Sequence, residues 1–85
     1  MKLYLTDSFK HDYKRLSPSI QKILDKKLLI LIENLKHPSL RIKKMQGHDF
    51  IWEGSITKKF RFTFQIESDV CVIRRAGTHD ILENP

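Results

Sequence analysis

The sequence predicts an α+β fold in which a two-helix hairpin packs on one face of an antiparallel four-stranded sheet that includes an N-terminal strand. Residues 1–37 carry apolar side chains at helical spacing, whereas residues 50–76 alternate apolar and polar side chains with the period of a strand. The chain has 85 residues, which predicts one domain over residues 1–85. A hydrophobic fraction of 40% suffices for one modest core.

The first half is predicted to begin with a strand over residues 2–5, after which Thr6 or Asp7 caps a helix. Three apolar residues of this helix share one face at spacing i, i+4, i+7. They are Phe9, Tyr13 and Leu16. A second helix restarts at Ser17-Pro18, because serine is a favoured N-cap and proline a favoured first helical residue.

The second helix is expected to run from Pro18 to about Asn34, and the residue before Pro38 ends it. Its buried stripe is expected to contain Ile20, Ile23, Leu24, Leu28, Leu31 and Leu35. Three further apolar residues widen the stripe, so we expect the middle of the helix to be covered on more than one side. They are Leu29, Ile30 and Ile32.

Three strands are expected over residues 50–56, 60–66 and 70–76. In the middle strand Phe60, Phe62, Phe64 and Ile66 face the helices, and Arg61, Thr63 and Gln65 face solvent. In the preceding strand Phe50, Trp52 and Ile56 share one side, and Glu53 and Ser55 share the other. Segment 38–49 joins the two halves as a basic loop.

The arginines of the last two strands predict an anion site on the solvent-facing side of the sheet. A three-residue turn over 67–69 pairs Ile66 with Val70, which places Arg61 opposite Arg75. Like charges directly opposite each other are unfavourable, so a bound anion between them would stabilise the pair. We therefore expect a phosphate site on this face.

Charge and composition narrow the class of protein. Sixteen Lys and Arg against ten Asp and Glu give a net charge of +6, which favours polyanionic or acidic partners. The longest apolar run, residues 28–32, is too short for a membrane span, and no signal peptide is expected at the start of the chain. With Cys71 as its single cysteine, the chain is expected in the reducing cytoplasm. The four histidines lack metal-ligand spacing, so no metal or cofactor is expected.

Several segments occur in an order that resembles the RelE/ParE superfamily of toxins from toxin–antitoxin pairs. They are Phe9 with Leu16-Ser17-Pro18, Ile42-Lys43-Lys44-Met45-Gln46-Gly47, Phe60-Arg61-Phe62-Thr63-Phe64 and Arg75-Ala76-Gly77-Thr78-His79-Asp80. The last of these is most similar to the YafQ-like branch. The resemblance implies a ribosome-dependent mRNA endonuclease that needs no metal, with an antitoxin protein, the ribosome and mRNA as partners and no membrane.

The resemblance also implies roles for individual residues. His79 would be the general acid or base, because imidazole exchanges protons near neutral pH, and Arg61 would hold the phosphate. Glu53 is a candidate base or an ion-pair partner of Arg61. Four more basic residues are candidates for contacts with the RNA backbone. They are Lys43, Lys44, Arg74 and Arg75.

The chain also departs from the family pattern on the first long strand. By ungapped alignment on Arg61, the lysines of RelE-type members fall at Trp52 and Gly54, and the histidine of YafQ-type members falls at Ser55. The Asp-Trp pair of YafQ falls at Lys59-Phe60, and the C-terminal aromatic of many members is missing. Two alternatives stay open: a ParE-like gyrase inhibitor, and a RelE-fold module that binds nucleic acid or antitoxin without catalysis.

Overall fold

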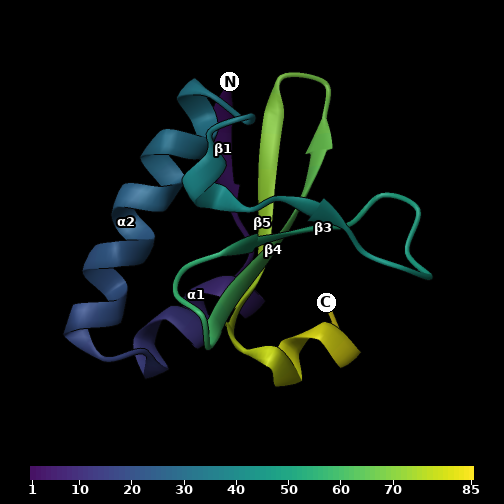
Figure 1. Cartoon of the computed structure of the whole chain (residues 1–85). Coiled ribbons are helices and arrows are strands. Elements are labelled where there is room, and N and C mark those ends of the chain that lie inside the picture. The colour runs from purple at the N-terminus through teal and green to yellow at the C-terminus, as the bar shows by residue number, and fades with distance from the viewer.

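The computed structural model describes residues 1–85 and contains the predicted elements in the predicted order (Figure 1). Strand β1 (Lys2–Leu5) is followed by helices α1 (Asp7–Arg15) and α2 (Pro18–Glu33). Next come a 3-10 turn η1 (Pro38–Leu40) and the strands β2 (Lys43–Lys44), β3 (Trp52–Ser55), β4 (Phe60–Glu67) and β5 (Val70–Thr78). A second 3-10 helix, η2 (His79–Glu83), ends the fold. No helix has the length and apolar character needed to cross a membrane.

Both predicted helix starts are confirmed by their caps. The Thr6 hydroxyl accepts a hydrogen bond from the Phe9 amide at 3.1 Å, and Ser17 is the N-cap of α2 with Pro18 in its first turn. Thr6 also donates to the carbonyl oxygens of Ile73 and Arg74, both at 3.0 Å. A single threonine therefore starts α1 and fixes that start against β5.

The sheet has five strands in the order β1-β5-β4-β3-β2, one more than predicted. The additional strand, β2, has two residues within the segment expected to be a loop, and it forms one edge. At the other edge, β1 pairs with β5 in parallel, while the remaining pairs are antiparallel. This parallel pair follows from the connection, because α1 and α2 lie between β1 and the rest of the sheet in the chain.

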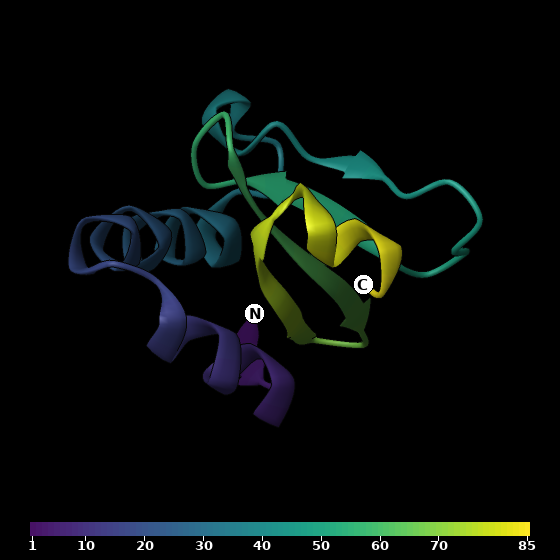
Figure 2. The ribbon, with the colours of Figure 1, turned by 90° about the horizontal axis from the view of Figure 1, so that it is seen from below.

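The two helices cover one face of the sheet, as predicted (Figure 2). The core between them and the strands includes Phe9, Leu24, Leu31, Phe62 and Phe64, each at most 2% exposed. The expectation that α2 is covered on more than one side is wrong, because Leu29 is 60% exposed. Phe50 was expected in a strand, on the same side as Trp52 and Ile56, but it is 78% exposed, because β3 begins only at Trp52 and Phe50 lies in the loop before it.

The predicted pairing of Arg61 with Arg75 is also wrong, because Arg61 lies opposite Gly77. The pairing of β4 with β5 differs from the predicted register by two shifts of one residue each. The turn between β4 and β5 has only two residues, so Glu67 pairs with Val70, and Ser68 in the turn has φ of 53°. A β-bulge then shifts the register again between Thr63 and Phe64.

The face expected to be open to solvent is covered by the last segment of the chain. η2 lies on the side of β4 and β5 away from α1 and α2 (Figure 2). Three residues expected on a wet face are buried: Glu53 is 5% exposed, Ser55 7% and Thr63 0%. The hydroxyl of Thr63 donates to the Pro85 oxygen of this last segment at 3.3 Å. The alternation along the strands was predicted correctly, but a second layer over this face was not.

Candidate functional site

Polar side chains form a row across the sheet face opposite the helices. In the strand registers Lys43 pairs with Glu53, Glu53 with Thr63, and Thr63 with Arg75. Directly paired residues project from the same side of a sheet, so these four share one face. Arg61 lies in the next row, between Ser55 and Gly77.

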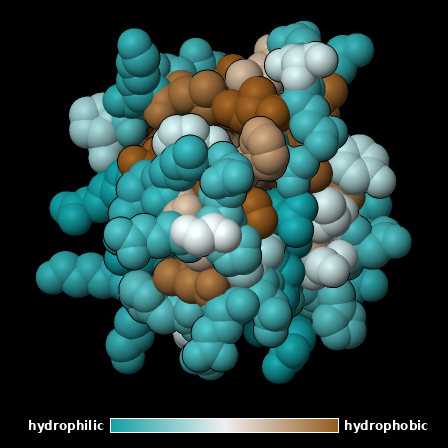
Figure 3. Space-filling model, turned by 90° about the vertical axis from the view of Figure 1, so that its right-hand side faces the viewer, coloured by the Kyte–Doolittle hydropathy of each residue, from teal (hydrophilic) through white to brown (hydrophobic).

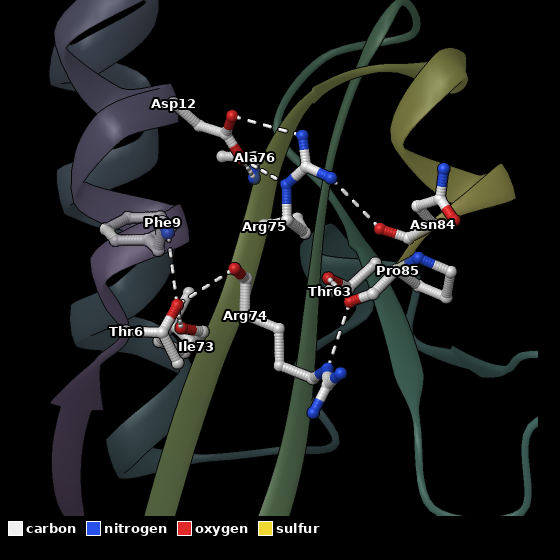
Figure 4. Close-up of polar contacts among 10 residues, drawn as sticks. All are labelled: Thr6, Phe9, Asp12, Thr63, Ile73, Arg74, Arg75, Ala76, Asn84 and Pro85. Atoms are coloured by element: carbon white, nitrogen blue, oxygen red, sulfur yellow. Dashed lines mark hydrogen bonds and ion pairs between the residues drawn. The ribbon is translucent and has the colours of Figure 1, made fainter.

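Arg75 is held at one end of this row by Asp12 of α1 (Figure 4). Its Nε donates to one carboxylate oxygen at 2.6 Å and its Nη2 to the other at 3.2 Å. Asp12 is 7% exposed and also accepts a hydrogen bond from the Ala76 amide at 3.1 Å. The hydrogen bond with Asp12 raises the pKa of the Arg75 guanidinium above its ordinary value. Arg75 is thus charged and fixed in orientation.

Three donors on this face converge on the end of the chain (Figure 4). The Pro85 main-chain oxygen accepts from Thr63 Oγ1 at 3.3 Å and from Arg74 Nε at 3.0 Å. The Asn84 oxygen accepts from Arg75 Nη1 at 3.0 Å. Arg74 also donates to the side-chain oxygen of Gln65. Because of the bulge, Arg74 and Arg75 are neighbours in sequence and yet both reach the same face.

Arg61 lies under η2. It is half-buried, and its Nε is buried without a hydrogen-bond partner. The Gly77 opposite it leaves room for Ile81, since a Cβ at position 77 would lie 2.9 Å from Ile81 Cγ2. A buried guanidinium nitrogen without an acceptor is unusual, so Arg61 stays a candidate binding residue although its Nε is covered in this structure.

His79 is the first residue of η2 and is exposed. The last pair between β4 and β5 joins Phe60 to Thr78, so His79 follows at the end of the sheet where Arg61 lies one pair earlier. Lys58 and Lys59, in the turn before β4, are exposed at the same end. This end of the sheet therefore carries an imidazole and several cations.

The remaining candidates lie at the β2–β3 edge. Lys43 and Lys44 are both exposed, and Lys43 Nζ lies 3.7 Å from Glu53 Oε1. Glu53 was proposed as a base or as a partner of Arg61, and the ion pair it forms is with Lys43. Lys43 thus adds a cation to this face at the β2 edge of the sheet, whereas Lys44 pairs with Trp52 and projects from the other face.

The sequence reasoning missed two polar residues of this face, Asp12 and Thr63. The sequence analysis assigned no role to Asp12, which lies one residue before Tyr13 of the predicted apolar face. Thr63 was assigned to solvent together with Arg61. The only signal in the sequence was indirect. The Arg-Arg pair at 74–75 lies in a strand, and an arginine that becomes buried there needs a carboxylate partner from elsewhere in the chain. No group of three or more His, Cys, Asp or Glu side chains is placed to hold a metal ion.

No family model and no curated protein matches the sequence, but solved toxin structures match the fold closely. A YoeB/ParE toxin from Agrobacterium tumefaciens has a TM-score of 0.81 at 18% identity, with 93% of this chain and 99% of that chain covered. The E. coli DinJ–YafQ toxin–antitoxin complex has a TM-score of 0.80 at 15% identity, with 95% of this chain and 94% of that chain covered. A copper-bound mutant toxin from Helicobacter pylori has a TM-score of 0.78 at 21% identity, with 94% of this chain and 96% of that chain covered.

These similarities confirm, at the level of the fold, the RelE/ParE resemblance inferred from the sequence motifs. In each case the match spans more than nine-tenths of both chains. With identities between 15% and 21%, the similarity extends to the fold and not to individual residues.

Proposed function

We propose that this protein is the toxin of a type II toxin–antitoxin pair and that it inhibits translation by cleaving mRNA on the ribosome. The observation that carries the proposal is the fold shared with toxins over more than nine-tenths of the chain, together with the cationic sheet face. One of these similar structures is a toxin bound to its antitoxin. The net charge of +6 suits an RNA substrate and an acidic partner.

The proposed reaction is attack of a ribose 2′-OH on the adjacent phosphorus. The products are a 2′,3′-cyclic phosphate and a 5′-OH, and no metal takes part. Arg61 neutralises charge on the phosphorane oxygens, and His79 exchanges the proton at the 2′-OH or at the leaving 5′ oxygen. Lys43, Lys44, Arg74 and Arg75 contact neighbouring phosphates. Because Glu53 is buried and paired with Lys43, we assign it to positioning of that basic surface.

This protein has an apolar surface to which the proposed antitoxin would bind. A groove of about 340 Å³ lies beside the sheet and is lined only by hydrophobic residues: Leu35, Ile42, Trp52, Phe64 and Ile66. Figure 3 shows the largest group of apolar side chains in the upper part of one face, with smaller apolar spots among hydrophilic side chains below it. A partner segment with both apolar and acidic side chains would cover such a surface and would stabilise the toxin by binding only its folded state.

The test is brief expression in growing bacteria, followed by primer extension on several mRNAs. Wild type should produce cuts within translated codons. Arg61→Gln and His79→Gln should each reduce cleavage by about 10²–10⁴-fold, the range for loss of one charge-stabilising or proton-transfer group. Arg41→Gln and His11→Gln remove the same side-chain types from exposed positions elsewhere and should cleave like wild type.

Two outcomes would contradict the assignment. Intact mRNA together with induced DNA damage would favour a ParE-like gyrase inhibitor, and the solved toxin described as YoeB/ParE keeps that alternative relevant. Growth without arrest in wild type, with RNA binding retained, would favour a module without catalysis.

A further inference from the structure

A pocket of about 270 Å³ lies at the end of the sheet where β4 begins and β5 ends. It opens between α1 and η2, which lie on either side of β5 (Figure 4). Its apolar wall is formed by Leu16, Phe60, Ala76 and Ile81, and we call it the end pocket. Pockets for drug-sized ligands begin at about 300 Å³, so the end pocket suits a smaller ligand with an apolar body.

Two charged side chains of the end pocket are free to bind a ligand. Arg15 at the last turn of α1 and Asp80 at the first turn of η2 both line the pocket and are exposed. The other two charged residues of the lining, Asp12 and Arg75, are bound to each other, whereas Arg15 and Asp80 form no ion pair. The pocket therefore offers the donors of a guanidinium and the two acceptor oxygens of a carboxylate.

The carboxylate of Asp80 indicates the class of ligand. It would repel a phosphate, and the neighbouring sheet face already carries the cations that suit an RNA backbone. Carboxylates in nucleic-acid sites instead accept hydrogen bonds from the amino groups of bases. Phe60 adds an aromatic ring to the apolar wall, and unpaired bases of RNA stack on such rings. This combination suits a single nucleobase.

Guanine is the RNA base that matches both charged groups. Its O6 and N7 atoms accept two hydrogen bonds from an arginine, and its N1–H and N2 amino groups donate two to a carboxylate. Adenine has an amino donor in place of O6. Cytosine has an amino group but no second donor beside it, and uracil has no amino group.

We infer that the end pocket binds a guanine of the RNA, with Arg15 bonded to O6 and N7 and Asp80 bonded to N1–H and the N2 amino group. This inference rests on the proposed function, because it names the base next to the phosphate that Arg61 and His79 engage. Phe60 directly precedes Arg61 in the chain, and Asp80 directly follows His79. The end pocket and the proposed reaction site thus lie at the same end of β4 and β5.

The experiment measures binding of 2′-O-methyl RNA hexanucleotides, which cannot be cleaved, by fluorescence anisotropy without ribosomes. Each is uridine throughout except for one guanine, adenine or cytosine, and a fourth contains uridine alone. Wild type should bind the guanine oligonucleotide about 5- to 100-fold more tightly than the other three, the range for bidentate recognition of a base.

Two guanine analogues test the individual contacts without altering the protein. Inosine lacks the N2 amino group that Asp80 would bind, and 7-deazaguanine lacks the N7 acceptor that Arg15 would bind. Each analogue should weaken binding by wild type about two- to tenfold, because it removes one bond of a bidentate pair.

Variants then assign each contact to its side chain. Asp80→Asn should bind guanine and inosine equally, and Arg15→Gln should bind guanine and 7-deazaguanine equally, because the partner of the missing group is gone. Asp7→Asn and Lys14→Gln are matched controls that should keep the guanine preference. Asp7 is an exposed acidic residue in the first turn of a helix, as Asp80 is, and Lys14 is the exposed neighbour of Arg15; neither lines the end pocket.

The outcomes separate this inference from the proposed cleavage. Equal affinity of wild type for the four oligonucleotides would overturn the inference, as would a preference for adenine or cytosine, or a guanine preference that Asp80→Asn and Arg15→Gln both retain. The proposed function would still stand if such a protein cut mRNA in cells. Conversely, a guanine preference lost in both pocket variants of a protein that makes no mRNA cuts would refute the cleavage and support the guanine site.

Discussion

Replacement of Asp12 by alanine should destabilise the protein more than any other single change to a polar residue. The carboxylate of Asp12 is 9% exposed and accepts three hydrogen bonds, from Arg75 Nε at 2.6 Å, Arg75 Nη2 at 3.2 Å and the Ala76 amide at 3.1 Å. Breaking a buried pair from one side costs about 3–5 kcal/mol. The Arg75 side chain is 29% exposed, so water replaces part of the interaction and the lower end, about 3 kcal/mol, applies.

This loss is large for so short a chain. A domain of 85 residues has a free energy of unfolding of roughly 4–13 kcal/mol, at about 0.05–0.15 kcal/mol per residue. A loss of about 3 kcal/mol should lower the melting temperature by about 12–24 °C, at about 4–8 °C per kcal/mol. Asp12→Asn keeps an acceptor for the Ala76 amide and should lose less. The assay is thermal and urea unfolding of both variants beside wild type.

A double-mutant cycle identifies the cause of this loss. If the pair is responsible, Asp12→Ala in an Arg75→Met background should cost much less than in wild type, because no cation remains to be left unpaired. A cost below about 1 kcal/mol for Asp12→Ala in the wild-type background would refute the reasoning.

Three further predictions concern the core and its limits. Burial raises the pKa of Cys71 to about 11, so the stability that the buried neutral thiol contributes is complete below about pH 9 and is lost as pH rises to about 11. Cys71→Ala should lack this alkaline loss when melting is measured against pH. The wild-type thiol should react with a thiol reagent only after unfolding. Gly54→Ala should cost at least about 1–3 kcal/mol in urea unfolding, because the new Cβ would lie 2.4 Å from the ring of Phe62; equal stability of the variant would show that the ring moves freely. Phe50→Ser should change the free energy of unfolding by less than about 0.5 kcal/mol, whereas Phe62→Ala should lose about 3–5 kcal/mol.

The parts of the fold that depend on local signals were predicted from the sequence. Thr6 and Ser17-Pro18 start helices at the expected residues because caps depend on a few neighbouring atoms. The alternation of Phe60 to Phe64 gave the strand and its two faces for the same reason. A local pattern of this kind shows where an element begins and which of its faces is apolar.

The parts that were missed depend on which segments meet. Leu29 and Phe50 are apolar, yet nothing in the chain packs over them, and a local pattern does not report that absence. The register of β4 and β5 changed by one residue at the turn and by one at the bulge, so the facing pair of Arg61 could not be read from alternation. The burial of Thr63 depends on residues 79–85, whose sequence has no strong period.

The cationic surface of this chain is built at other positions than in the pattern of the family it resembles. Trp52 and Gly54, where ungapped alignment expects lysines, pair with Phe64 and Phe62 on the face that packs against the helices. A lysine at 54 would meet the ring of Phe62, so the cationic surface cannot be built there. One extra residue in β5 instead brings Arg74 to the same face as Arg75, although neighbours in a regular strand point to opposite faces. The positive charge of the candidate site thus comes from β4 and β5, and the short β2 adds Lys43 at the sheet edge.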